Sequence, residues 1–495
     1  MSLDDIRNER IKKLENLKEK GIDAYPASAN RDFSIAEVLK DFTKLSKKKK
    51  HSFVAGRIMA VREHGGSIFF DINDGSGQIQ GYLKKDEIGE KNFSLFKETA
   101  DIGDFVELKG HFFITKKKEK TIKVSAWKMI SKSLRPLPSQ WYGLQDTEER
   151  FRKRYLDLIM NDEVKFRFIL RSKIISEIRS YLDKDGFIEV ETPILQPIAG
   201  GALAEPFKTY HNALDINLYL RIAPELYLKE LLIGGINKVY EIGRNFRNEG
   251  IDATHNPEFT SIEIYEAYKD TEDLRKFIKK LLQAIIKKTT GKNEIKFNDN
   301  KINFAKEYSV VSYFEALKKY VLIIDPTNTS REDVALKAKQ FGIEVKNFET
   351  KEKILDNLFK KMCRPKMIQP TFVIDYPVGT SPLAKRKENN KNMIDRLQLI
   401  IGGLEIVNGF SELNDPIDQK ERFKEQDRVK EMGEKEISPS DEDYLEAMEY
   451  GMPPAAGWAI GIDRLTMLLT DTQNIREVIF FPTLRPRNAE DEIHR

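Results

Sequence analysis

The hydrophobic pattern of the chain changes character near residue 50. Before that point, apolar side chains recur every three to five residues from Leu3 to Leu17, and Gly21 offers a left-handed stop. This spacing is typical of an amphipathic helix that ends at a glycine. A helix is therefore predicted over 3–20.

After the four lysines at 47–50, short segments rich in Val, Ile and Phe alternate with turn residues. Such segments at roughly 8–12-residue spacing indicate a small barrel or sandwich. Five strands of this size suit an oligonucleotide-binding (OB) barrel. The expected strands are 52–62, 67–73, 78–83, 104–114 and 121–130.

A second domain is expected after the proline-containing segment 135–143, which we interpret as a linker. A long helix with a core-facing stripe should run from Asn161 to Gly186, and strand pattern follows as far as Tyr268. The Lys-rich stretch 271–365 has a mostly helical pattern and is interpreted as an inserted helical subdomain.

Strand pattern returns at 370–376 and 394–413, and a glycine-rich turn with a helix follows within 457–470. The predicted fold class is α+β. The first domain, 1–140, has an N-terminal helix and a β-barrel, and the second, 141–495, has a sheet flanked by helices.

Composition narrows the class of protein. The 495 residues include 83 Lys+Arg and 79 Asp+Glu, and the net charge of +4 excludes a polybasic nucleic-acid binder but not a local basic patch. The single cysteine, Cys363, excludes a disulfide framework and a zinc site with two or more thiolates. No apolar run reaches the roughly 18–20 residues of a membrane span, and the N-terminus does not resemble a signal peptide. We expect a reducing, cytoplasmic setting and no membrane partner.

Polar and aromatic side chains gather on a predicted strand–loop–strand unit after the long helix. Phe259, Glu263 and Tyr265 are separated by even steps, so they share one face of the second strand. Arg247 and Glu249 are two residues apart and share one face at the end of the first strand. A face made only for packing would not collect charges, because unpaired buried charges are costly. The alternative is the solvated face of an ordinary hairpin.

A second candidate segment follows the predicted hairpin turn at Gly402-Gly403. Asn408, Phe410 and Glu412 share one strand face there. Glu405 has the opposite parity, so it reaches the same site only through a bulge or a twist. The alternative is a half-exposed strand without a site.

A third segment lies near the C-terminus. Gly457 and Gly461 permit close backbone approach, and Arg464 falls in the first turn of an apolar helix. A cation beside the free N–H groups of a helix start makes an anion site. Without the other two segments, a glycine turn packed on a core helix would be the preferred interpretation.

Together these segments resemble the three motifs of class II aminoacyl-tRNA synthetases. DGFIEVETPIL is similar to motif 1, FRNE with HNPEF to motif 2, and GIDR to motif 3; they lie at 185–195, 246–249, 255–259 and 461–464. The chain most resembles the bacterial lysyl-tRNA synthetases, over nearly its whole length, through GGALAEPF (200–207), RIAPELYLKELLIGG (221–235) and NGFSELNDPIDQ (408–419). This resemblance implies an OB-fold anticodon-binding domain and a catalytic domain with an antiparallel sheet flanked by helices. It also implies a homodimer with motif 1 at the interface.

The resemblance implies ATP-dependent activation of L-lysine to lysyl-adenylate and transfer to the 3′ end of tRNA(Lys). Arg247, Glu249 and Arg464 would be the catalytic residues. Arg247 would hold the α-phosphate and Arg464 the γ-phosphate, while Glu249 accepts from the adenine amino group. The other implied ATP-binding positions are His255, Asn256, Phe259 (stacked on adenine), Glu405, Ile406 and Gly461.

Selecting a lysine requires buried negative charge, which also rejects neutral amino acids. The resemblance assigns Glu412 and Tyr265 to the ε-ammonium group, and Glu225 with the Gly201 carbonyl to the α-ammonium group. The remaining implied lysine-binding residues are Arg247, Glu263 and Asn408.

Mg²⁺ is the expected cofactor, because it bridges ATP phosphates and is held by one or two carboxylates. Glu405 matches one metal ligand of the family, and Gln398 occupies the second position in place of the usual glutamate. Its amide oxygen would bind Mg²⁺ more weakly. Glu205 is a further departure, since relatives usually carry arginine there.

In the barrel, Arg62, Phe69 and Gln80 match the family's anticodon-binding positions. An exposed aromatic ring can stack on a splayed base while Arg and Gln read its edge. Strand parity leaves open whether Phe69 or the adjacent Phe70 faces the barrel core.

Three alternatives to lysine–tRNA ligation remain at this point. An aspartyl- or asparaginyl-type enzyme would share the scaffold, but an aspartate enzyme needs a cation that is missing at the matching positions. A non-catalytic RNA-binding paralogue is disfavoured because the activation residues are intact. An enzyme that lysylates proteins would lack the barrel.

The segment KMISKS at 128–133 resembles a loop of class I synthetases. In that class the loop occurs together with a HIGH sequence motif, and the chain has no such motif, so we interpret the resemblance as coincidence.

Overall fold

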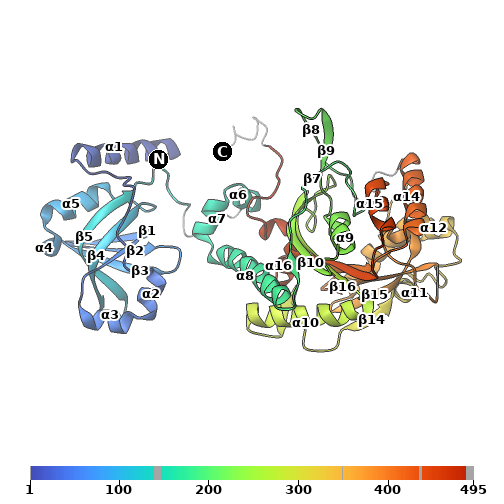
Figure 1. Cartoon of the computed structure of the whole chain (residues 1–495). Helices are drawn as coiled ribbons and strands as arrows, with labels where there is room; N and C mark the ends of the chain where they lie inside the picture. The colour runs from blue at the N-terminus through green and yellow to red at the C-terminus, as the bar shows by residue number, and fades with distance from the viewer. Residues whose placement is uncertain (1, 139–145, 348, 434–436, 487–495) are drawn as a thin grey trace. The chain divides into compact units, whose positions relative to one another are not determined.

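The computed structural model describes residues 2–138, 146–347, 349–433 and 437–486 (Figure 1). The chain divides into two compact units, Met1–Met160 and Asn161–Arg495. The first unit also holds α6 (Thr147–Arg152) and α7 (Arg154–Met160). The predicted boundary at 140/141 and most of the predicted linker lie outside the described residues, so that boundary stays a prediction.

The first unit is built on a closed five-stranded barrel with the strand order β1-β2-β3-β5-β4. Every predicted strand is present within two residues of its expected ends. The strands are β1 (Ser52–His64), β2 (Ser67–Asn73), β3 (Gln78–Lys84), β4 (Phe105–Ile114) and β5 (Lys120–Ser131). The helices are α1 (Leu3–Glu19), α2 (Ile35–Lys40), α3 (Phe42–Lys48), α4 (Lys85–Ile88) and α5 (Glu90–Thr99).

The barrel core settles which phenylalanine faces inward. Phe70 is fully buried, whereas Phe69 is only partly buried on the opposite face of β2. Phe70 fits because its neighbour on β3 is Gly81, where an added Cβ would lie 2.6 Å from the Phe70 ring.

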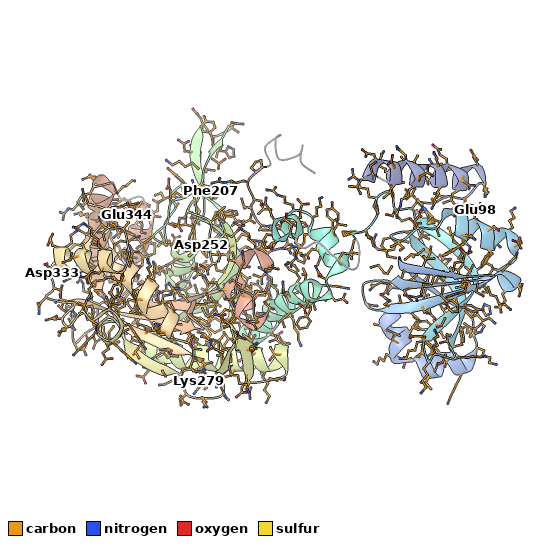
Figure 2. The ribbon with its side chains drawn as sticks, turned by 180° about the vertical axis from the view of Figure 1, so that it is seen from behind. Glu98, Phe207, Asp252, Lys279, Asp333 and Glu344 are labelled. Atoms are coloured by element: carbon orange, nitrogen blue, oxygen red, sulfur yellow. The ribbon has the colours of Figure 1, made fainter. Side chains whose placement is uncertain are left out.

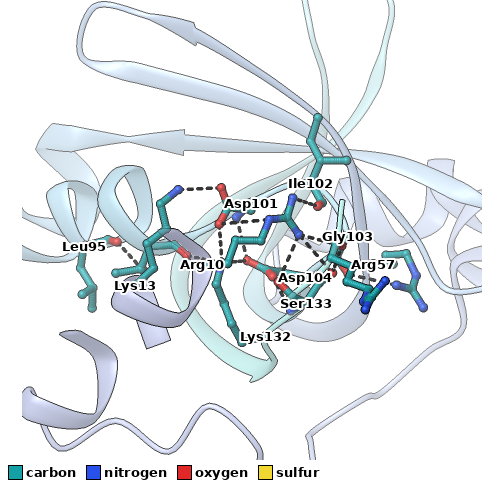
Figure 3. A network of polar contacts seen from close by, with 12 residues as sticks. Arg10, Lys13, Arg57, Leu95, Asp101, Ile102, Gly103, Asp104, Lys132 and Ser133 are labelled. Carbon is teal, nitrogen blue, oxygen red and sulfur yellow. Dashed lines mark hydrogen bonds and ion pairs between the residues drawn. The ribbon is translucent and has the colours of Figure 1, made fainter. Parts of the chain in front are cut away.

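A polar network ties α1 to the barrel (Figure 3). Lys132 is fully buried, and its Nζ lies 2.5 Å from Asp101 Oδ2 and 2.8 Å from Asp104 Oδ2. From α1, Arg10 donates to the carbonyls of Ile102, Ser133 and Arg135. Burial raises the pKa of Asp104 even beside Lys132, so this carboxylate depends on its cation to stay charged.

The second unit is organised around an eight-stranded sheet with the order β14-β15-β16-β17-β18-β11-β10-β6. The two outermost pairs, β14–β15 and β10–β6, are parallel, and the other neighbours are antiparallel. The strands are β6 (Ile188–Glu189), β10 (Lys238–Phe246), β11 (Glu258–Ala267), β14 (Ser309–Ser312), β15 (Thr371–Pro377), β16 (Met393–Ile401), β17 (Leu404–Ser411) and β18 (Ala455–Gly461).

Helices cover both faces of this sheet. Along β11, Ile262 and Ile264 pack into a core with the long helix α8, while Tyr265 and Ala267 pack into a second core with α9. This alternation follows from the two-residue period of a strand. On the first side lie α8 (Asp162–Lys184), α10 (Thr271–Thr290) and α16 (Ile462–Leu469); on the second lie α9 (Glu225–Ile233), α11 (Tyr313–Val321), α13 (Lys351–Leu358) and α15 (Glu442–Glu449).

The remaining elements complete the second unit. A three-stranded sheet contains β7 (Leu195–Gln196), β9 (Ile216–Leu220) and β8 (Lys208–His211), and a hairpin contains β12 (Glu294–Phe297) and β13 (Asn300–Asn303). The other helices are α12 (Arg331–Gln340), α14 (Pro416–Glu431), a π-helical turn at Phe359–Cys363, and 3₁₀ turns at Arg364–Lys366, Val378–Thr380 and Ile475–Glu477. Among the described residues, no helix is both long enough and apolar enough to cross a membrane.

Three sequence predictions need correction. The stretch after the long helix, predicted as strands as far as Tyr268, also contains the helix α9. The stretch 271–365 is helical in α10, α11, α12 and α13, but it also contains the hairpin β12–β13 and the strand β14, which joins the main sheet. The glycine-rich turn predicted at Gly457 is wrong, because Gly457 lies within β18. Glycine is the expected residue of a turn, but here it serves a close approach between strands.

We expect Asp104→Ala to destabilise the barrel by about 3 kcal/mol, because it leaves Lys132 without one of its buried partners. Hydrogen exchange of the β4 and β5 amides in the full chain measures this free energy. Asp86→Ala is the matched control, since Asp86 forms an exposed ion pair with Lys84, and its loss should cost less than about 1 kcal/mol. Equal losses in the two variants would contradict the role of the network.

Candidate functional site

A cavity of about 500 Å³ lies in the second unit, along β11, β17 and β18. Its wall contains every site residue predicted for this unit except Glu412. These residues are Gly201, Glu225, Arg247, Glu249, His255, Asn256, Phe259, Glu263, Tyr265, Gln398, Glu405, Ile406, Asn408, Gly461 and Arg464. The solvated-hairpin alternative is therefore wrong for β11.

Part of the cavity wall carries arginine. Arg247 follows the last residue of β10, its backbone N–H donates to the Pro257 carbonyl at 2.8 Å, and its guanidinium lies 5.1 Å from the Phe259 ring. Its Nε is buried and has no hydrogen-bond partner among the described residues. A buried cationic nitrogen without a partner is costly, so this part of the cavity is suited to an anion.

Arg464 comes from the first turn of α16, as predicted. Its guanidinium lies 2.9 Å from His255 Nε2, and Nδ1 of His255 lies 2.8 Å from Asp252 (labelled in Figure 2). The start of α16 is fixed by Asp463, which accepts from the Thr260 backbone at 2.8 Å. The helix start and the loop between β10 and β11 are thus held together.

Glu405 reaches the cavity through a bulge. The pairing of β16 with β17 shifts register between Leu399 and Ile400, which pair with Val407 and Glu405. This irregularity brings Glu405 into the same wall as Asn408 in spite of their opposite parity. The twist or bulge that the sequence required is therefore present.

The surroundings of Glu405 keep it ionised. Burial alone would raise its pKa, but Arg364, Arg464 and other cations lower the pKa to about 2. Gln398 donates its amide N–H to Glu405 at 3.0 Å, and the amide oxygen of Gln398 accepts from Tyr376 at 2.8 Å.

Glu405 and Gln398 fit a Mg²⁺ ion that binds together with phosphate groups and is coordinated by one carboxylate of the protein. The described residues contain no group of three or more His, Cys, Asp or Glu side chains that could hold a metal by themselves. Gln398 would present an oxygen to the metal only if its amide turned over, because its oxygen now faces Tyr376.

Another part of the cavity wall is acidic. Glu263 and Tyr265 lie two residues apart on β11, and the Tyr265 hydroxyl donates to Glu263 at 3.0 Å. Glu225 begins α9 beside Gly201, whose φ of +87° and lack of a side chain allow this approach. Burial raises the pKa of Glu263 to about 8, and repulsion from Glu225 adds to the effect.

Glu412 lies just behind the cavity wall. Its side chain is fully buried, and Oε1 has no hydrogen-bond partner among the described residues. Gly457 lies beside it in the cavity wall, and an added Cβ there would lie 2.3 Å from Glu412 Oε1 and 2.2 Å from the Tyr265 ring, so the lack of a side chain leaves room for both groups. Burial raises the pKa of Glu412 to about 8, although Lys229 acts in the opposite direction.

Sequence reasoning missed Lys229, whose Nζ lies 2.6 Å from Glu225 and 2.5 Å from Glu412. The signal was available: Glu225 and Lys229 are four residues apart on an apolar helix, so they share one face. It also missed Arg396, which donates to the Asn408 amide oxygen at 2.9 Å and so orients Asn408. The unusual Glu205 touches the site through its backbone, whose carbonyl accepts from Asn248.

The residues predicted in the barrel lie on adjacent strands. Arg62 of β1 pairs with Asp71 at 3.1 Å, and Phe69 of β2 stacks on Tyr82 with ring centroids 4.7 Å apart. Gln80 of β3 accepts from Thr121 and pairs in register with Asp71. Together they form one partly exposed face with an aromatic centre.

Comparisons with known proteins agree for both units. The family model described as "tRNA synthetases class II (D, K and N)" matches residues 146–485, and the model described as "OB-fold nucleic acid binding domain" matches 53–130. The lysine–tRNA ligase of Syntrophomonas wolfei is 47% identical over 99% of this chain and 99% of its own length. The corresponding ligase of Carboxydothermus hydrogenoformans is 48% identical over 98% of this chain and 99% of its own length. The lysine–tRNA ligase of Aquifex aeolicus is 49% identical over 89% of this chain and 74% of its own length.

Proposed function

The chain belongs to the lysine–tRNA ligases of the class II aminoacyl-tRNA synthetases, and from this membership we propose how its residues share the reaction. It is a ligase that joins lysine to tRNA. The aspartyl, asparaginyl and non-catalytic alternatives are set aside, because relatives with lysine specificity match nearly the whole chain.

The distribution of charge in the cavity carries the proposal. Arg247 and Arg464 line the cavity together with Glu225 and Glu263, and Glu412 is buried just behind its wall. ATP and the carboxylate of lysine require cations, whereas the two ammonium groups of lysine require carboxylates. ATP and lysine together therefore satisfy both the arginines and the carboxylates.

In the first step, a carboxylate oxygen of lysine attacks the α-phosphorus of ATP, and pyrophosphate leaves. Arg247 holds the substrate carboxylate and the α-phosphate, because its permanently charged fork suits a pentacoordinate oxyanion. Arg464 holds the γ-phosphate. The resting contact of Arg464 with His255 supports this role, since both side chains face the open cavity.

The adenine ring stacks on Phe259, and Glu249 accepts from its amino group. Asn256, Ile406 and Gly461 complete the nucleotide site, which their place in the cavity wall supports. In the second step, the 3′-terminal ribose hydroxyl of tRNA attacks the lysyl carbonyl carbon, and AMP leaves.

Glu412 and Tyr265 bind the ε-ammonium group, and Glu225 with the Gly201 carbonyl binds the α-ammonium group. Glu263 orients Tyr265 through their hydrogen bond, and Asn408 contacts the amino acid. The unpartnered Oε1 of Glu412 supports this division, because a buried carboxylate oxygen needs a donor.

When bound, Mg²⁺ shields the charge of the phosphate oxygens during phosphoryl transfer. We propose Glu405 as its carboxylate ligand and Gln398 as a weaker ligand after its amide turns over. The low pKa of Glu405 keeps this carboxylate ionised at neutral pH.

The barrel face binds the anticodon of tRNA(Lys): Phe69 stacks on a base, and Arg62 and Gln80 bind base edges. The outward position of Phe69 supports this proposal. Nearby Lys118 and Lys120, which line a hollow beside Gln80, supply charge for the phosphate backbone.

We propose a homodimer formed through α8 and the segment after it. Phe166 and Ile169 lie on one exposed side of α8 at 60% and 58% exposure, and Ile188 and Leu195 are also exposed. Apolar side chains gathered in this way favour a protein interface.

Lysine-dependent ATP–pyrophosphate exchange tests the function. Glu412→Gln should raise the KM for lysine roughly 100-fold with little change in the KM for ATP, because it removes a buried charge that pairs with an ammonium group. Glu449→Gln, an exposed change on α15, is the matched control. Exchange driven by aspartate or asparagine instead of lysine would refute the function, and equal losses for lysine and ATP would refute the role of Glu412.

The lysine site should depend on pH. With pKa values of about 8, Glu263 and Glu412 carry protons in the empty cavity at neutral pH, whereas an ammonium group binds the ionised form. The KM for lysine should therefore fall roughly tenfold or more between pH 6.5 and 8.5, while the KM for ATP changes little. Steady-state exchange rates across this range measure both. A KM for lysine that stays constant or rises would contradict the assignment.

Phe166→Asp should convert the dimer into monomers, because an unpaired charge in an apolar interface is costly. Light scattering at micromolar concentration measures the mass. Ile324→Asp is the control, as Ile324 is 80% exposed between α11 and α12, away from α8. Dimers that survive the α8 substitution would place the interface elsewhere.

A further inference from the structure

Lys229 is a buried cation that the proposed mechanism does not use. Its side chain has no exposed surface, and its Nζ pairs with Glu225 on its own helix and with Glu412 at the end of β17. The Phe410 ring lies 5.3 Å from Nζ. Tyr444 faces it from α15, and burial raises the pKa of that phenol well above its ordinary value, so Tyr444 remains neutral.

The charges around Lys229 are unequal in number. Glu225, Glu263 and Glu412 are the carboxylates of this part of the cavity, and Lys229 can neutralise only one of them. Arg221 is also near Glu263, but it forms its own buried ion pair with Glu241. When all three carboxylates are ionised, two negative charges are therefore left over, and Arg247 lines the same cavity.

A lysine substrate supplies the missing charge. Its two ammonium groups match the two remaining carboxylate charges, and its carboxylate matches Arg247. Without Lys229, three ionised carboxylates would face two ammonium groups, and one would have to keep a proton or remain unpaired at high cost. The filled pocket is electrically neutral only because Lys229 is present.

We propose that Lys229 sets the charge of the lysine pocket: it neutralises one of three buried carboxylates, so that two negative charges remain for the two ammonium groups of the substrate. It also holds Glu225 and Glu412 at the two points where those groups bind. Lys229 is thus a positioning residue that determines specificity without touching lysine. This inference rests on the proposed function of the cavity.

The proposal makes an unusual prediction for paired substitutions. Glu225→Gln alone leaves Lys229 paired with Glu412, so a single negative charge faces the two ammonium groups. Adding Lys229→Met frees Glu412 and restores two negative charges. The double variant should therefore bind lysine better than Glu225→Gln alone, with a KM for lysine about tenfold lower, as expected for coupled neighbours. The KM for ATP should be the same in both variants.

Lysine-dependent ATP–pyrophosphate exchange of the full chain measures both constants, and thermal unfolding confirms that each variant is folded. Removing Glu225 and Lys229 together replaces a buried ion pair by neutral groups, which proteins tolerate better than the loss of one partner. Lys229→Met alone should raise the KM for lysine and move the pH at which lysine binding improves upward, because the cation that favours ionised carboxylates is gone.

A purely structural role for Lys229 predicts the opposite result. If the double variant binds lysine no better than Glu225→Gln, or cannot fold, Lys229 acts through packing and the proposal is overturned. The lysine dependence of exchange in the unmodified chain distinguishes this outcome from a failure of the proposed function. Exchange that does not depend on lysine in the unmodified chain refutes the function itself, whereas lysine-dependent exchange without the predicted improvement refutes only the role of Lys229.

Discussion

The central constraint on the second unit is the cost of burying charge. Its cavity is lined by carboxylates and guanidinium groups, which the main sheet and the segments packed against it supply. None of these groups would be stable in an apolar core without partners. The cores on the two faces of the sheet hold the strands rigidly, so the charged groups cannot move apart to reach water. The empty protein therefore keeps protons on Glu263 and Glu412 at neutral pH, and a doubly cationic amino acid would let these carboxylates ionise.

Much of this arrangement was predictable from the chain itself. The alternation of Phe259, Glu263 and Tyr265 identified the polar face of β11, because a strand has a period of two residues. The barrel strands were equally clear, since each is short and bounded by turn residues. The helix start at Arg464 followed from the change of pattern after Gly461. In each case a local rule was sufficient.

Other features depend on tertiary context that local rules do not contain. The bulge at Glu405 results from the pairing of β17 with β16, and nothing in β17 alone requires it. Gly457 resembles a turn residue until its neighbours on β11 and β17 are known. The choice between Phe69 and Phe70 was decided by Gly81 on the next strand. The strand β14 joins the sheet from inside a segment whose composition favours helices, because its partner β15 is supplied by a distant part of the chain.

The network around Lys132 has a consequence for the limits of the first unit. Arg10 of α1 binds the carbonyls of Ser133 and Arg135, so the first helix and the segment after the last barrel strand are joined through one guanidinium group. An excised barrel that begins at β1 would contain every strand but lose Arg10, which would open the edge of the Lys132 cluster to water. One that ends with β5 at Ser131 would lose Lys132 itself. The smallest autonomous RNA-binding fragment should thus extend beyond the matched OB-fold region, 53–130, in both directions.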